Sequence, residues 1–128
     1  MFTFDRFEEN AVYGEHDFHV SRDKVSEWYE LFPEEEEANE IMPVGMTTVV
    51  MMHAYGDLVT PRPPGNIHGA QRFEIHRLPR IGEILTTRVR CEGKEIKKGR
   101  GWVYLLFETR DAKDEIVFLG RFTSLPAK

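Results

Sequence analysis

The chain has 128 residues, of which 41% are hydrophobic and 30% are charged, and its formal net charge is −5. These values are typical of one soluble globular domain, residues 1–128, that is large enough to bury a core. The acidic balance argues against a nucleic-acid partner, because phosphate binding calls for a basic surface.

Cysteine usage and the first residues bear on the compartment. Cys91 is the only cysteine, so no intramolecular disulfide can form and a reducing, cytoplasmic location is expected. The opening residues, MFTFDRFEEN, lack the basic and apolar regions of a secretory signal.

The first third of the chain predicts a short strand, a short helix and a loop. Residues 16–20 (HDFHV) favour the strand, and residues 21–33 favour the helix, with Ser21 as its N-cap and Pro33 at its end. Apolar residues recur at helical spacing at Val25, Trp28, Tyr29 and Phe32. The acidic run EEEEANE that follows predicts a solvated loop, since consecutive Glu side chains do not converge on one ion.

The most apolar segment, IMPVGMTTVVMMHAYGDLV (residues 41–59), contains four of the five methionines. It is too long for an average strand and lacks a period of two, so it predicts a helix over residues 43–58, with Pro43 in the first turn. Apolar side chains fall on nearly every face, which predicts a helix buried all round. The Pro, Gly, His and Asp residues within the segment make it a poor membrane span.

Four strands are predicted after this helix, at residues 67–78, 83–92, 102–110 and 116–125. In the second of them, Leu85, Val89 and Cys91 share one face, while Arg88 and Arg90 lie on the other. The third strand is apolar on both faces and is therefore expected at the centre of the sheet. Polar turns that contain Gly predict an antiparallel meander. A curved antiparallel sheet wrapped around one long central helix is an α+β architecture, the hot-dog fold.

Three segments carry a resemblance to the MaoC-like dehydratases: VSRDKVSEWYELF, MPVGMTTVV and IHGAQRFEIHRLPRIGEIL. In the last of these, the strand ends in an Arg-Pro turn and a Gly-acid pair, formed by Arg77, Pro79, Gly82 and Glu83. The resemblance covers roughly residues 16–125 by element order, and it is strongest to the N-terminal half of two-domain enoyl-CoA hydratases. These motifs belong to the fold, and none of them is a catalytic signature.

The resemblance also implies catalytic residues that this chain lacks. Family members place an Asp and a His just after the short helix, where the two act as general base and acid around one water. The matching stretch here, LFPEEEEANEIMPVG, contains neither residue. Related dehydratases and hot-dog thioesterases carry an acid along the central helix, and none lies between Met46 and Tyr55. The family's catalytic residues are therefore not carried over.

The start of the central helix is the best remaining candidate for substrate binding. In this fold, backbone N–H groups there polarise a thioester carbonyl, and Gly45 and Met46 occupy that place. The alternative is that Gly45 serves only helix–sheet packing. Met46, Val49 and Val50 are interpreted as core or as the wall of an acyl tunnel. Arg62 is a candidate for binding a CoA phosphate. The basic residues around Lys97 are a further candidate, although a solvated turn is the favoured interpretation of that segment.

Two histidines are candidate catalytic residues. His53 lies about two turns beyond Met46 on the same helix, and the alternative is a core histidine held by a neighbour. His68, in the strand after the helix, is expected to face an acyl pocket or a subunit boundary. His76 falls among alternating charged positions and is interpreted as a surface residue.

The leading functional hypothesis is a subunit of a MaoC-like enoyl-CoA hydratase or 3-hydroxyacyl-CoA dehydratase (a lyase of fatty acid metabolism). The chain would shape the acyl tunnel beside a second hot-dog subunit that carries the Asp/His pair. One alternative is a non-catalytic acyl-CoA-binding or assembly module that forms a homo-oligomer, a dimer or larger. Another is a thioesterase that uses His53 and a water. An acyl-CoA or acyl-carrier thioester is the expected ligand, with no cofactor, metal or membrane.

Overall fold

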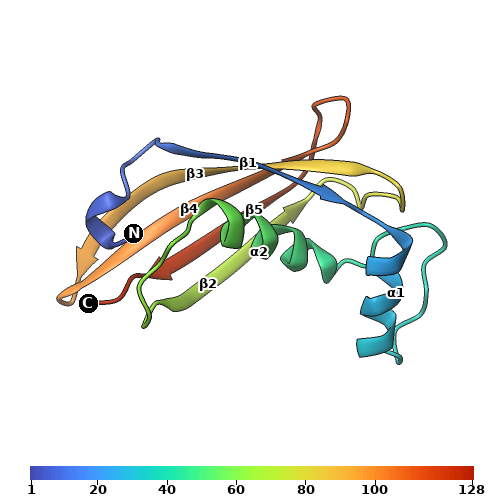
Figure 1. Cartoon of the computed structure of the whole chain (residues 1–128), viewed down its shortest axis with the longest axis horizontal. Helices are drawn as coiled ribbons and strands as arrows, with labels where there is room; N and C mark the ends of the chain where they lie inside the picture. The colour runs from blue at the N-terminus through green and yellow to red at the C-terminus, as the bar shows by residue number, and fades with distance from the viewer.

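The computed structural model describes residues 1–128 and has at its centre a five-stranded antiparallel sheet that curves around one helix (Figure 1). The elements are η1 (Phe4–Arg6), β1 (Val12–His19), α1 (Arg22–Leu31), α2 (Met46–Leu58), β2 (Ile67–Ile75), β3 (Ile84–Lys97), β4 (Arg100–Arg110) and β5 (Ile116–Leu125). The strand order is β1-β3-β4-β5-β2. This architecture confirms the predicted hot-dog fold.

The first helix forms as the sequence predicts. Ser21 caps α1, because its side-chain oxygen accepts a hydrogen bond from the Lys24 N–H at 3.2 Å. The strand before it, β1, is longer than predicted, since it begins at Val12 instead of residue 16. The acidic residues 34–40 that follow α1 are all exposed, in agreement with a solvated loop.

The central helix, α2, departs from the prediction in two ways. It begins at Met46, because Pro43 lies before the helix and its carbonyl accepts the Met46 N–H. It is also buried on one side only. Residues facing the sheet are fully covered, whereas an open face remains exposed at Met52, His53, Gly56 and Asp57. The predicted all-round burial is wrong for the single chain, since the sheet wraps one side of the helix. Neither α1 nor α2 is long and apolar enough to cross a bilayer.

The sheet confirms the predicted strands but corrects their order. β3, β4 and β5 form the expected meander, and β4 lies in the middle with Leu105 and Leu106 buried on opposite faces. β2 does not extend this meander next to β3. It pairs instead with β5 at the far edge, where Arg72 lies opposite Arg121. Residues 76–83 therefore connect β2, at one edge of the sheet, to β3. β3 lies next to β1, which forms the opposite edge.

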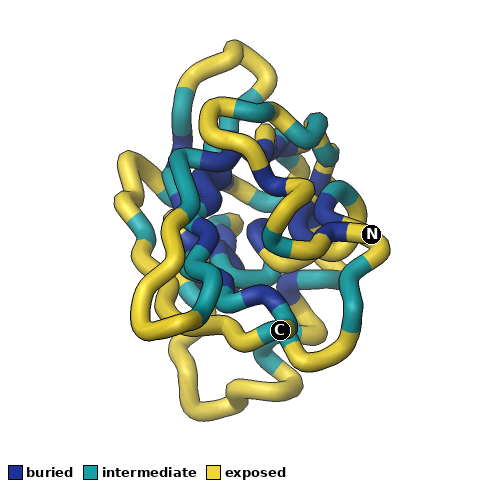
Figure 2. The backbone as a smooth tube through the Cα atoms, turned by 90° about the vertical axis from the view of Figure 1, so that its left-hand side faces the viewer, coloured by how far each residue is buried: buried dark blue, intermediate teal, exposed yellow.

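β2 is an edge strand with little cover on either side. Eight of its nine residues are exposed and only Phe73 is half-buried. Buried positions gather along the inner strands and the inner side of α2, as Figure 2 shows for the whole backbone. The outer edge of β2 therefore presents backbone hydrogen-bonding groups without a neighbouring strand, together with the exposed side chains of Ile67 and Ile75.

The two chain ends lie together, at the end of the sheet remote from α1 (Figure 1). The Phe2 N–H donates to the Pro61 carbonyl at 2.7 Å, and the Ala127 N–H donates to Asn66 Oδ1 at 2.8 Å. Phe2 and Phe7 are buried and pack edge-on against Tyr13. The N-terminal residues thus close this end of the core.

Candidate functional site

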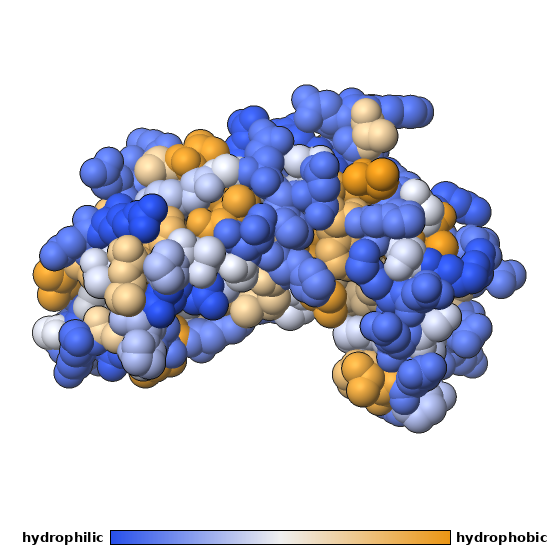
Figure 3. All heavy atoms as spheres, viewed as in Figure 1, coloured by the Kyte–Doolittle hydropathy of each residue, from blue (hydrophilic) through white to orange (hydrophobic).

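A cleft of about 260 Å³ separates α1 from the first half of α2. Its lining comes from one face of each helix, and it consists of Lys24, Glu27, Trp28, Leu31, Met46, Val49 and His53. On α1 these positions are three, four and seven residues apart, so their side chains share a face. The space-filling view shows α1 projecting from the body beside a hollow (Figure 3). The cleft combines apolar walls with a few polar groups, as small-molecule sites usually do.

The structure brings three of the predicted site residues together in this cleft, namely Met46, Val49 and His53. Val50 points elsewhere, since it is fully buried in the core cluster between α2 and the sheet. The α1 side of the cleft was not predicted from the sequence, where Trp28 enters only as one of the apolar residues at helical spacing. The recurrence of Lys24, Trp28 and Leu31 along one helical face was the available signal.

The backbone at the start of α2 is already engaged. The N–H groups of Met46, Thr47 and Thr48 donate to carbonyls three residues earlier, at 3.0, 3.1 and 3.2 Å. The Trp28 ring covers Gly45 and fills the space that a Cβ atom there would need. A thioester carbonyl could reach the Met46 N–H only after a local rearrangement. Gly45 has a clear packing role in this conformation, while its part in polarising a carbonyl stays a prediction.

His53 lies at the edge of the cleft with both ring nitrogens free of hydrogen bonds within the chain. Its ring packs edge-to-face on Phe18, with ring centroids 5.3 Å apart. One turn further along α2, Asp57 Oδ2 lies 2.8 Å from His16 Nδ1 on β1. The exposed His53 imidazole is therefore available to exchange a proton with a bound molecule.

Glu27 is the second titratable group of the cleft without a hydrogen-bond partner or an ion pair in the chain. The neighbouring Lys24 is engaged, because its ammonium donates to the His19 carbonyl at 2.8 Å and lies over the Phe18 ring. Glu27 and His53 thus supply one free carboxylate and one free imidazole to the same cleft. No group of three or more His, Cys, Asp and Glu side chains is placed to hold a metal ion.

His68 lies outside the cleft. It sits on β2, and its ring stacks on Phe122 with centroids 4.1 Å apart and planes inclined by 28°. Phe122 in turn packs against Tyr55 of α2 at 4.8 Å. His53 lines the cleft and His68 does not, so the cleft does not bring the two candidate catalytic histidines together.

Arg62 is used at the C-terminal end of α2. Its Nη1 group donates to the carbonyls of Tyr55 and Val59 at 3.3 and 2.7 Å, and its guanidinium lies over the Tyr55 ring. These carbonyls belong to the last turn of the helix, where a cation is favourable. A contact between Arg62 and a CoA phosphate remains a prediction.

Comparison with known proteins finds likeness in structure alone. No family model matches the sequence, and no curated protein matches it. The MaoC-like dehydratase of Rhodospirillum rubrum superposes with a TM-score of 0.82 at 12% identity, over 100% of this chain and 99% of that one. The (R)-hydratase of A. caviae involved in PHA biosynthesis gives a TM-score of 0.78 at 10% identity, over 95% and 98% of the two chains.

A third similar structure is a complex. The C-terminally truncated HadBC (3R-hydroxyacyl-ACP dehydratase) complex of Mycobacterium tuberculosis gives a TM-score of 0.75 at 15% identity, over 91% of this chain and 96% of that one. At such identities the likeness establishes the fold. The chain therefore has the hot-dog fold, in the form found in MaoC-like dehydratases and (R)-hydratases.

Proposed function

We propose that this chain is an acyl-thioester-binding subunit of a hydratase or dehydratase of the MaoC-like type. It holds the acyl chain in the cleft between α1 and α2 and works with a second hot-dog chain that supplies the catalytic Asp/His pair. The observation that carries the proposal is the cleft itself, with its apolar walls of Trp28, Leu31, Met46 and Val49 beside the start of the central helix.

The cleft suits an acyl chain for physical reasons. Its walls offer aromatic and aliphatic surface to methylene groups, and burial of each methylene contributes about 0.8 kcal/mol. Met46 is unbranched and flexible, so the slot can adapt to chains of different shape. Affinity should then rise roughly fourfold with each added methylene until the slot is full.

The second chain is proposed from two incomplete surfaces. β2 has no neighbouring strand on its outer edge, and α2 exposes Met52, which a single copy leaves in contact with water. An added hot-dog chain that pairs with β2 would cover both. The similar HadBC structure is a complex, which supports the same arrangement here.

Fluorescence of Trp28 tests acyl binding directly. Trp28 and Trp102 are the only tryptophans, so Trp102→Phe leaves the cleft residue as the sole reporter. Titration with saturated acyl-CoAs of increasing length should give a saturable change with stepwise tighter binding. Val49→Phe, which narrows the cleft, should weaken binding about tenfold or more by overpacking.

Ile96→Phe is the matched control, because Ile96 is 70% exposed near the end of β3 and lies outside the cleft. It should bind acyl-CoA like the parent. No binding at any chain length, or an equal loss in both variants, would contradict the proposed site.

Activity measurements test whether catalysis requires the second hot-dog chain. The purified chain alone should not hydrate crotonyl-CoA above background, whereas its complex with a hot-dog chain that carries the Asp/His pair should do so. Genes adjacent to this one are the first place to find that partner. Robust activity of the chain alone that survives His53→Ala and His68→Ala would overturn the proposal.

The free Glu27 carboxylate and His53 imidazole in one cleft favour a second candidate, a hydratase active without a partner. One group would take a proton from water as it attacks the β-carbon, and the other would protonate the α-carbon. Glu27→Gln and His53→Ala would then each lower kcat about 100-fold or more, while Lys24→Met would have little effect. Acyl-CoA binding without activity in any pairing would instead indicate a non-catalytic binding module.

A further inference from the structure

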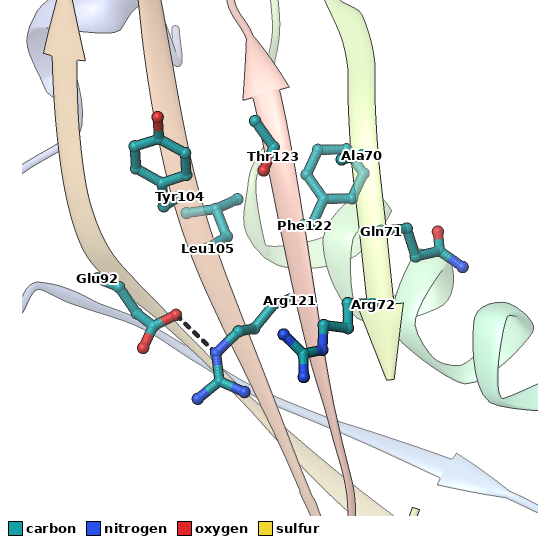
Figure 4. Close-up of a pocket in the computed structure, with 9 residues that line it drawn as sticks. All are labelled: Ala70, Gln71, Arg72, Glu92, Tyr104, Leu105, Arg121, Phe122 and Thr123. Carbon is teal, nitrogen blue, oxygen red and sulfur yellow. Dashed lines mark hydrogen bonds and ion pairs between the residues drawn. The ribbon is translucent and has the colours of Figure 1, made fainter. Parts of the chain in front are cut away.

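A second hollow lies on the outer face of the sheet, which is turned away from α2 (Figure 4). Its volume is about 530 Å³, and residues of β2, β3, β4 and β5 line it. None of these residues belongs to the cleft between α1 and α2. The hollow therefore does not form part of the site proposed above.

Two neighbouring rows of side chains form the hollow. In one row Tyr104, Thr123 and Ala70 are register partners across β4, β5 and β2. The small side chains of Thr123 and Ala70 leave a depression beside the Tyr104 ring. The Tyr104 hydroxyl donates to Glu95 at 3.2 Å, so the ring is held in place as a wall.

The next row places two arginines side by side. Arg121 and Arg72 are register partners on β5 and β2, and Arg72 reaches from β2 toward Arg121 (Figure 4). Arg121 forms one ion pair, in which its Nε lies 3.3 Å from Oε1 of Glu92. Its two terminal nitrogens have no partner, and Arg72 donates to no acceptor of the chain. Like charges directly opposite one another are unfavourable, and a single carboxylate, that of Glu92, lies against the two guanidinium groups.

Other arginines on the same face are matched with acids. Arg88 lies 3.0 Å from Glu15, and Arg90 and Arg110 both contact Glu108. The chain as a whole has five more acidic than basic side chains. Among these arginines only Arg72 has no carboxylate partner, and it lines the hollow together with Arg121.

We propose that this hollow binds a small organic anion, with its carboxylate or phosphate group held by Arg72 and Arg121 and its apolar body lying on Ala70, Thr123 and the Tyr104 ring. Guanidinium groups present planar, paired N–H donors that match the oxygens of either anion. The proposal is independent of the acyl-thioester site, because the two share no residue.

Nuclear magnetic resonance titration of the full chain tests the site. Phenyl phosphate and benzoate serve as the two anionic probes, and benzyl alcohol as the uncharged probe of similar shape. Phenyl phosphate, benzoate or both should shift the Arg72 and Arg121 Nε–H signals and the amide signals of Ala70 and Thr123 in a saturable way. The stronger of the two anions identifies the headgroup. Benzyl alcohol should cause no saturable shift at the same concentrations.

Arg72→Gln and Arg121→Gln should each weaken binding about tenfold or more, by loss of one charged partner. Arg88→Gln, on the same face but already paired with Glu15, is the matched control and should bind like the parent. Arg72 is exposed and contacts no acceptor, so Arg72→Gln is expected to stay folded even if Arg121→Gln does not. Absence of saturable shifts with both anions, or equal weakening by Arg88→Gln, would overturn the proposal.

Discussion

The indole ring of Trp28 on α1 occupies the space that a Cβ atom at Gly45, the N-cap of α2, would require. This contact fixes α1 against the start of the central helix and forms one wall of the cleft. Gly45 has ordinary helical backbone angles, with φ −63° and ψ −24°. Its lack of a side chain is therefore needed for the approach of Trp28 and not for the backbone conformation.

Gly45→Ala should destabilise the fold by about 1–3 kcal/mol, because the added methyl group overpacks the Trp28 contact. Ala is also less favourable than Gly at an N-cap, so a second background is needed to assign the loss to the Trp28 contact. Urea unfolding of the parent and the variant measures the difference. In a Trp28→Ala background the penalty should become clearly smaller, and an unchanged penalty there would show that the ring is not its cause.

Arg62→Ala should lower the free energy of unfolding by about 1–2 kcal/mol, because the last turn of α2 loses two hydrogen bonds and the cation over Tyr55. Arg62→Lys keeps the positive charge but lacks the planar guanidinium group. Its free energy of unfolding should lie between those of the parent and of Arg62→Ala. Lys113→Ala in the exposed β4–β5 turn is the control. Unchanged stability with weaker acyl-CoA binding would instead favour the CoA-phosphate role predicted from the sequence.

Acid should weaken the link between the β2–β3 connection and the β4–β5 turn. Arg77 donates to Glu83 at 2.9 and 2.7 Å and to Asp111 at 2.8 Å, and these bonds lower the pKa of both carboxyl groups, helped by backbone N–H donors. A depressed pKa in the folded state means that the stabilisation is complete above the unfolded pKa values, roughly 4. It is lost as the pH falls through the lower folded values.

Arg77→Gln should therefore be less stable than the parent at pH 7, and the difference should shrink at pH 3 and below. Denaturant unfolding across this pH range measures it. Arg22→Gln, which breaks the exposed pair with Glu40, is the control and should change stability by about 0.5 kcal/mol or less. A difference for Arg77→Gln that is the same at every pH would contradict this account.

Cys91 should react slowly with thiol reagents in the folded protein. Its side chain is fully buried on β3, and burial raises the pKa of the thiol, which reduces the thiolate fraction at neutral pH. In denaturant, labelling of Cys91 with a disulfide reagent should be rapid and stoichiometric. In the absence of denaturant, the labelling rate should be limited by the rate at which the structure opens. Fast labelling of the native protein would show that β3 opens readily around Cys91.

The sequence pattern predicted most of the secondary structure because that pattern is local. Leu85, Val89 and Cys91 are all fully buried, as their alternation requires, and β5 has the predicted bounds. The place of β2 is a non-local choice. Its residues alternate too weakly to show which strand they will pair with, so a meander was the simplest expectation.

The candidate site was harder to predict than the fold. Apolar residues such as Met52 indicate burial without indicating whether the cover comes from the same chain or from another one. Trp28 illustrates a further difficulty, because helical spacing identifies a side chain that packs but cannot show that the packing leaves a cleft beside it. The spacing places Glu27 on the same face of α1 as Trp28, but only the structure shows that this face lines a cleft together with His53.

The shared location of the two chain ends has a practical consequence. Thr3 and Lys128 line one hollow. The two chain ends lie at the end of the sheet remote from α1 (Figure 1). An affinity tag or a fused protein attached at either terminus would therefore leave from that end. The chain can be immobilised on a sensor surface through residue 1 or 128 with α1 directed into the flowing solution.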